Sequence, residues 1–226
     1  MQESSPDPSL TQLDTQGDRN AHQLEHLANC RLRMIVVGGG IGGLSAAIAL
    51  RRHGHEVVVL ERAPRLESVG AGITLFANAM DALGKLEVAD AVAAAGAPAT
   101  HSAILTSDGR ELTKMPSDLL AGAVAVHRGD LQAALQRAAG AIRVGAEITS
   151  VDQSGDGAVA QAADGTGERG DLLIGADGLW SLVRDRVAPA APRYGGYVAW
   201  RGVSPVTVEV GSPKRIVGSR RALWTR

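Results

Sequence analysis

A run of glycines between an apolar segment and an alanine-rich segment most constrains the fold of this chain. Residues 38–43 read GGGIGG, which contains the spacing GxGxxG at Gly38, Gly40 and Gly43. Glycines at this spacing allow a tight turn, a close approach of the backbone to a diphosphate, and close packing of a helix on a strand. The run therefore predicts a sharp turn from a strand into a helix.

The flanking segments agree with that prediction. Residues 34–37 (MIVV) form a continuous apolar, β-branched run, which is typical of a strand buried on both faces, and residues 44–53 favour a helix. Residues 56–61 (EVVVLE) predict a second strand, so the segment is a right-handed βαβ unit. Glu61 ends that strand, where a carboxylate can accept hydrogen bonds from a ribose. This indicates a dinucleotide site, NAD or FAD, with a purely structural turn as the alternative.

The rest of the chain predicts short elements of both kinds. We expect helices at 76–86, 88–95, 130–139 and 179–187, a hairpin of 102–106 with 111–114, strands at 142–144, 148–152, 158–163 and 172–174, and an extended segment at 194–203.

Composition excludes several other classes. Lys and Arg number 23 against 24 Asp and Glu, and this balance gives no global reason to bind nucleic acid. The single cysteine, Cys30, cannot form an intrachain disulfide, which favours a cytoplasmic location. The longest uncharged stretch, 34–50, is short for a membrane span and rich in glycine, so we expect no membrane span.

Residues 1–33 are polar and contain few branched apolar side chains, so they predict a disordered tail, with Met34 as a candidate start of translation. The tail contains HxxEH at His22, Glu25 and His26, a spacing found in one class of zinc peptidases. No apolar helix supports it, so we expect a solvated segment and no metal site. Ser181 lacks the GxSxG context of a hydrolase nucleophile.

Several later segments carry a family resemblance. They are ERAPR at 61–65, GAGIT at 70–74 with Asn78, HR at 127–128 leading into Asp130, DLLIGADG at 171–178 with Ser181 and Arg184, and YGGYVAWRG at 194–202. Together with the glycine run they resemble the single-component FAD-dependent aromatic hydroxylases, the flavoprotein monooxygenases that include salicylate, hydroxybenzoate and urate hydroxylases.

The resemblance implies an α/β fold: a Rossmann-like FAD-binding fold of the glutathione-reductase type with the start of a mixed β-sheet substrate domain. The implied FAD-binding domain covers 34–190, with inserted β and α segments around 70–127, and 191–226 begins the substrate domain. The family's second flavin element, a Gly-Asp-Ala turn, has no counterpart after residue 203. We therefore expect the N-terminal half only, with the C-terminal half missing.

The resemblance also implies cofactor-binding residues. The diphosphate would lie against the glycine turn, Glu61 would hold the adenosine ribose, and Asp177 would orient donors such as Arg184 or backbone amides near the diphosphate. The full set that would bind the cofactor is Gly38, Gly40, Ile41, Gly42, Gly43, Glu61, Arg62 beside the adenine, Gly72, Arg128, Ile148 near the adenine, Asp177 and Gly178. No catalytic residue is identified, although Tyr197 and Arg201 would border the substrate side.

The implied activity is hydroxylation of a small aromatic substrate: NADH or NADPH would reduce FAD, and O2 would add at the flavin C4a position to give a hydroperoxide. Two alternatives remain at this stage. The chain could be a non-catalytic remnant from a frameshifted or split gene. It could also be an NAD-dependent Rossmann dehydrogenase, which would account for residues 38–61 and leave 171–184 unexplained.

Overall fold

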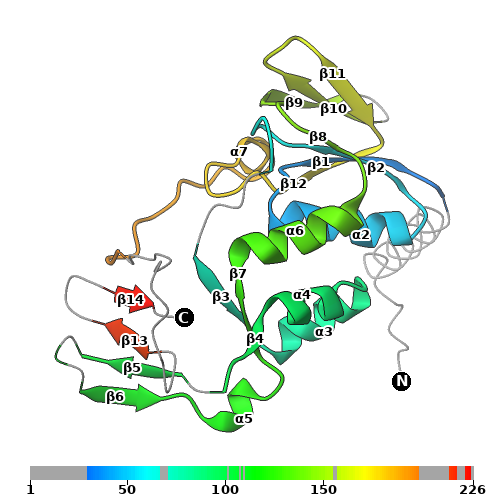
Figure 1. Ribbon diagram of the computed structural model, residues 1–226. Coiled ribbons are helices and arrows are strands. Elements are labelled where there is room, and N and C mark those ends of the chain that lie inside the picture. Colours follow the sequence, from blue (N-terminus) through cyan, green and yellow to red (C-terminus); the bar gives the residue numbers. More distant parts are fainter. Residues whose placement is uncertain are drawn as a thin grey trace, which may run out of the picture.

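The centre of the fold is a parallel sheet with the strand order β12-β1-β2-β8 (Figure 1). The computed structural model describes residues 30–66, 71–100, 102–106, 108, 110–154, 157–198, 214–217 and 222–224. The four strands of the sheet are β1 (Arg33–Val37), β2 (Glu56–Leu60), β8 (Ile142–Arg143) and β12 (Leu172–Gly175). Because β1 pairs in parallel with both β2 and β12, the carboxyl ends of these three strands meet at one edge.

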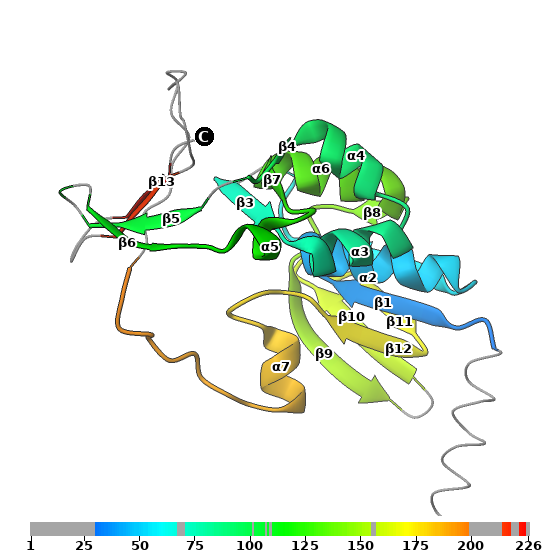
Figure 2. The ribbon, with the colours of Figure 1, turned by 90° about the horizontal axis from the view of Figure 1, so that it is seen from below.

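Helices cover one face of this sheet, as Figure 2 shows. They are α2 (Ile41–Arg52), α3 (Ala77–Lys85), α4 (Ala89–Ala95) and α6 (Arg128–Ala139). Leu44 and Ile48 of α2 share a buried cluster with Leu131 and Leu135 of α6. This apolar contact fixes α6 against the helix that follows the glycine turn.

An antiparallel meander covers the opposite face (Figure 2). It consists of β9 (Ile148–Ser154), β10 (Gly157–Ala162) and β11 (Gly167–Gly170), and α7 (Leu182–Val187) lies on the same side. Ile35 and Val37 of β1 are buried toward this layer, whereas Met34 and Val36 are buried toward α2. Strand β1 is apolar at every one of these positions because both of its faces are covered.

Two smaller sheets complete the described part of the chain. One has the order β3-β7-β4, from β3 (Gly72–Leu75), β7 (Val124–His127) and β4 (Ala97–Pro98). The other has the order β14-β13-β5-β6, from β14 (Ala222–Trp224), β13 (Lys214–Val217), β5 (Ala103–Leu105) and β6 (Glu111–Lys114). It lies apart from the parallel sheet, beyond the short helix α5 (Ser117–Leu120) (Figure 1).

The structure confirms the βαβ unit and the hairpin of β5 and β6. Most predicted boundaries differ from the structure by one to three residues: β1 already includes Arg33, β2 ends at Leu60 rather than at Glu61, and α7 begins at Leu182 rather than at residue 179. Strands β3, β4, β7, β11, β13 and β14 and helix α5 were not predicted. Residues 1–29, with the HxxEH spacing, and 199–203 lie outside the described residues.

In the part of the chain that the structure describes, no helix is both long enough and apolar enough to cross a membrane.

Candidate functional site

The turn between β1 and α2 needs glycine at two positions for packing alone. Gly38 has φ +110°, and a Cβ built on it would lie 2.3 Å from the carbonyl oxygen of Ala176. A Cβ on Gly43 would lie 1.9 Å from the carbonyl oxygen of Gly38. These contacts are with backbone atoms, so no rotation of a side chain can relieve them. Gly38 and Gly43 therefore let β1, α2 and the end of β12 approach each other closely.

The other end of the turn is open. Gly40 is the N-cap of α2, no side chain caps that end, and its first turn contains no acidic residue. A Cβ on Gly40 or on Gly42 would meet no atom within 4 Å. Among the described residues, none accepts a hydrogen bond from the amides of Gly40 to Gly43. Free amides at the positive end of a helix attract an anion. The open backbone of Gly40 to Gly43, called the cradle below, therefore fits a diphosphate.

Glu61 lies directly against this turn. Its Oε2 accepts a hydrogen bond of 2.6 Å from the amide of Gly39, and its Oε1 accepts one of 2.9 Å from the amide of Ala63. A carboxylate has further lone pairs, so these two bonds leave it able to accept from the hydroxyls of a ribose. The acidic residue at the end of β2 and the glycine turn at the end of β1 thus form one site.

Asp177 follows β12, on the other side of β1. The amide of Ala176 donates to the carbonyl of Val37 at 2.8 Å, which holds this segment beside the glycine turn. Asp177 Oδ1 accepts from the Ser181 hydroxyl at 2.5 Å, and Oδ2 accepts from the amides of Leu182 and Val183 at 2.8 and 3.2 Å. Asp177 therefore caps the N-terminus of α7.

This arrangement corrects one detail of the sequence interpretation. Asp177 accepts from the backbone amides of Leu182 and Val183, and the Arg184 side chain is not its partner. The Arg184 guanidinium donates to the carbonyl of Leu179 and to the carboxylate of Asp185. The Ser181 hydroxyl, to which the sequence assigned no role, accepts from the Arg184 amide at 2.9 Å. A serine three residues before that amide has N-cap spacing, which could have placed the helix start.

We expect Asp177→Ala to lower the free energy of unfolding by about 1–2 kcal/mol, the usual effect of replacing a capping side chain by alanine. Alanine removes the carboxylate that accepts from the Ser181 hydroxyl and from the amides of Leu182 and Val183. Urea denaturation followed by circular dichroism measures the change. Asp185→Ala is the matched control, because the Asp185 side chain is exposed and pairs with Arg184 alone among the described residues. Equal losses in the two variants would contradict the capping role.

Gly72 and Arg128 lie together at one end of the β3 and β7 pair. Gly72 pairs with His127, and the Arg128 amide donates to the carbonyl of Ala71 at 3.1 Å. The Nδ1 of His127 accepts from the amide of Gly129, so this histidine caps α6. The Arg128 side chain is exposed. Arg128 therefore begins the helix that packs on α2.

The remaining predicted residues border the end of β2. The amide of Ala146 donates to the carbonyl of Glu61 at 2.8 Å, which places the segment before Ile148 beside Glu61. The side chain of Arg62 is exposed, and that of Ile148 is half-buried. The structure thus gathers most of the predicted set around the carboxyl ends of β1, β2 and β12, the edge where open parallel sheets bind ligands.

One contact at this edge was missed from the sequence. Gln132, in α6, donates from Nε2 to the carbonyl of Gly39 at 3.3 Å. It lies four residues after Arg128, on the same side of the helix. The spacing of four residues from Arg128 could have indicated that Gln132 lies on the side of α6 that faces the site.

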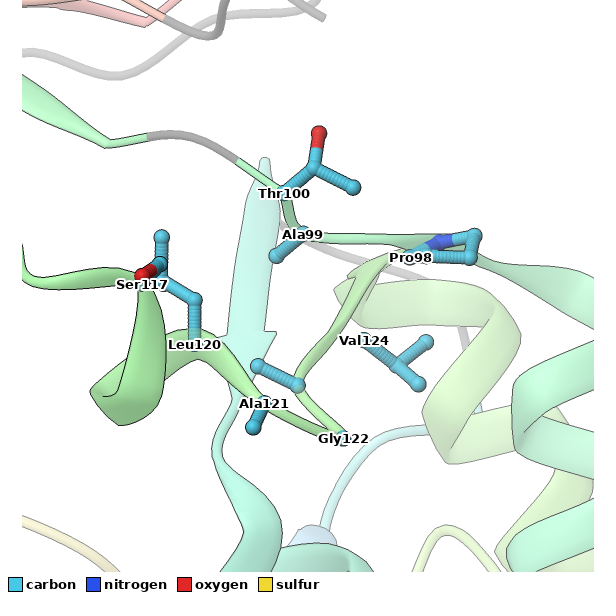
Figure 3. A pocket seen from close by; sticks show the side chains of 9 residues that line it. Pro98, Ala99, Thr100, Ser117, Leu120, Ala121, Gly122 and Val124 are labelled. Atoms are coloured by element: carbon cyan, nitrogen blue, oxygen red, sulfur yellow. The ribbon is translucent and has the colours of Figure 1, made fainter.

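A hollow elsewhere contains none of the predicted site residues. It has a volume of about 410 Å³ and is lined by residues of β4, α5 and β7 and their connections, Leu120 and Val124 among them (Figure 3). The labelled side chains are apolar apart from Thr100 and Ser117. Within the described ranges no group of three His, Cys, Asp or Glu residues could hold a metal ion. Arg201 lies outside the described residues, and Tyr197 is exposed.

Comparison with known proteins identifies the family. A family described as "FAD binding domain" matches residues 31–224. Aurachin C monooxygenase/isomerase of Stigmatella aurantiaca is 43% identical over 184 residues, covering 78% of this chain and 48% of that protein. For 3-hydroxybenzoate 6-hydroxylase 1 of Aquipseudomonas alcaligenes the identity is 35%, covering 76% of this chain and 47% of that protein.

Solved structures agree. The crystal structure of Klebsiella pneumoniae HpxO with FAD and uric acid matches with a TM-score of 0.62 and 29% identity, over 72% of this chain and 43% of that one. The chain thus spans about half the length of the curated relatives it matches. The resemblance and the α/β FAD-binding fold are confirmed, and the match favours FAD over the NAD-dependent dehydrogenase alternative. The chain belongs to the family of flavin-dependent aromatic monooxygenases that share this FAD binding domain.

Proposed function

We propose that this chain forms the FAD-binding part of a monooxygenase that hydroxylates a small aromatic substrate, with NADH or NADPH as electron donor and O2 as co-substrate. The relatives support this class, since one is named a hydroxybenzoate hydroxylase and another a urate hydroxylase. The single observation that carries the proposal is the open cradle at the start of α2, with Glu61 bonded to it.

Each predicted residue then has a binding role. The amides of Gly40, Ile41, Gly42 and Gly43 would hold the diphosphate, while Gly38 keeps the turn tight. Glu61 would accept from the adenosine ribose, with Arg62 and the backbone near Ile148 beside the adenine. Arg128, which begins α6, would place its guanidinium against a phosphate or flavin oxygen, where its fixed fork of donors suits an anionic acceptor. Gly72 lies beside it.

Asp177 and Gly178 would act indirectly. A carboxylate cannot face a diphosphate favourably, and Asp177 is already bonded to the first turn of α7. We propose that it holds the backbone around Gly178 in place at the edge of the cofactor site. Gly178 has φ +86°, a conformation that favours glycine.

The bound FAD would supply the redox chemistry, namely electron uptake from NADH or NADPH and activation of O2. The chain's own contribution is to bind and orient the cofactor. No proton donor or acceptor for the substrate is assigned to this chain.

We also propose the domain division made from the sequence, with 34–190 as the FAD-binding domain and 191–226 as the start of the substrate domain. One pairing bears on it: β13, at Lys214–Val217, adds in parallel to β5 of the inserted hairpin. The substrate sheet would then take strands from the insertion around 70–127 as well as from the later segment.

Titration with FAD and, separately, with NAD tests the proposal. We expect the purified chain to quench flavin fluorescence saturably and to show no saturable binding of NAD under the same conditions. The reason is that the cradle suits a diphosphate, while the family match specifies FAD. Isothermal titration calorimetry with both nucleotides provides the measurement.

Oxidation of NADH and NADPH, followed at steady state with a panel of hydroxylated aromatic acids, extends the test to activity. Saturable FAD binding without substrate-stimulated oxidation would restrict this chain to cofactor binding and support the remnant alternative. Absence of FAD binding would overturn the proposal itself.

A further inference from the structure

Gly39 is held from both sides, although the family spacing GxGxxG does not specify a residue there. Its amide donates to Glu61 Oε2 at 2.6 Å, and its carbonyl oxygen accepts from Gln132 Nε2 at 3.3 Å. Since a carbonyl oxygen can only accept, the nitrogen end of the Gln132 side chain must face it. Both polar groups of the Gly39 backbone are therefore bonded to side chains.

The second of these bonds fixes a peptide plane. The carbonyl of Gly39 and the amide of Gly40 belong to one planar, trans peptide group, so they point in opposite directions. Because Gln132 draws the carbonyl toward α6, the Gly40 N–H points away from α6. Gly40 is the N-cap residue of α2, beside the free amides that would receive the diphosphate.

The helix that carries Gln132 is rigidly placed. Its neighbour Leu131 is 1% exposed and Leu135 is fully buried, and both pack in one cluster with Leu44 and Ile48 of α2. The backbone of Gln132 is therefore fixed relative to the turn. The Gln132 side chain itself is half-buried, which strengthens its hydrogen bond relative to one in water.

We propose that Gln132 is a positioning residue for FAD binding: it orients the Gly39–Gly40 peptide so that the Gly40 amide is presented to the diphosphate. This inference rests on the proposed function, because it assigns a residue to the same cofactor site. Gln132 acts through Gly39 and not by touching the cofactor.

Two substitutions test it. Gln132→Met keeps the length of the side chain and removes the donor, and we expect it to weaken FAD binding about five- to tenfold, the usual effect of one hydrogen bond. Gln132→Glu restores a donor only when its carboxyl group is protonated. We therefore expect its FAD affinity, relative to the original chain at each pH, to be lowest near about pH 8 and to recover toward about pH 5.

Gln136→Met and Gln136→Glu are the matched controls. Gln136 is the same residue type on the same helix, it is exposed, and among the described residues its side chain makes no hydrogen bond. These two variants should bind FAD as the original chain does at every pH. Thermal unfolding of all four variants without FAD tests whether the fold is kept.

A readout without FAD separates this proposal from the proposed function. In protein labelled with ¹⁵N-glycine, the Gly40 amide resonance should titrate with pH in Gln132→Glu and not in Gln136→Glu, because Gly40 shares its peptide group with the bonded carbonyl. If the original chain binds no FAD, the proposed function fails. The titration then still decides whether the side chain at position 132 bonds to the carbonyl of Gly39. A Gly40 resonance that behaves alike in both variants, or unchanged FAD affinity in Gln132→Met, would overturn the proposal.

Discussion

Gly43→Ala is expected to lower the free energy of unfolding by about 3 kcal/mol or more, at the upper end of what overpacking costs. The added methyl group would lie 1.9 Å from the carbonyl oxygen of Gly38 and 3.2 Å from the Cβ of Ala176. Relief requires α2 to move away from β1, which would open the buried cluster of Met34, Val36 and Ala47. Urea denaturation followed by circular dichroism measures the loss, and an insoluble product is its extreme form.

Gly42→Ala is the matched control for this substitution. Gly42 is the preceding residue of the same helix, and a Cβ there meets no atom within 4 Å. Alanine is the better helix former, so this variant should be as stable as the original chain or more stable by up to about 1 kcal/mol. If both variants unfolded alike, the cause would be the helix itself and not the contact with Gly38.

Gly40→Ala, unlike Gly43→Ala, should leave the stability of the fold unchanged and weaken FAD binding about ten- to a hundredfold. Gly40 has φ −74° and ψ −178°, which alanine adopts without strain, and no protein atom lies within 4 Å of the new Cβ. The open space is needed because the backbone must approach the diphosphate closely. A misplaced methyl group costs roughly 1–3 kcal/mol, which corresponds to that loss of affinity.

The measurement pairs FAD titration with thermal unfolding of the FAD-free protein. Gly84→Ala in α3 is the control, since Gly84 is exposed and, like Gly40, has open space at its Cβ position. We expect Gly84→Ala to leave FAD affinity unchanged. Undiminished affinity in Gly40→Ala would mean that the cofactor does not lie over this end of α2.

The sequence alone predicted the elements whose residues are set by local physics. Strand β1 is buried on both faces, so its apolar run was unambiguous, and the glycine spacing required the turn before α2. Strand β11, by contrast, reads GERG and has no apolar pattern. It is a strand because β10 offers its free edge to residues 167–170. Such a tertiary pairing overrides local propensity and cannot be predicted from one segment.

The same distinction applies to the site. Gly38, Gly40, Gly43 and Glu61 follow from a spacing within one βαβ unit, and the structure places Glu61 against the turn as that spacing requires. The contact of Gln132 with Gly39 depends on how α6 packs across α2, which is decided by apolar side chains far apart in sequence. The spacing from Arg128 indicates the face of α6 on which Gln132 lies, but it does not indicate which backbone group that side chain meets.

The position of β12 has a consequence for how the chain reaches its native state. Strand β1 pairs on one edge with β2, which follows it after a single helix. Its other edge pairs with β12, which comes much later in the chain. The hydrogen bond between Arg33 and Asp171, for example, joins residues 138 positions apart. Contacts so distant in sequence form late and slow the folding rate. Until β12 has paired with β1, β1 exposes an apolar, unpaired edge of the kind that promotes aggregation. We therefore expect refolding yield to depend strongly on protein concentration.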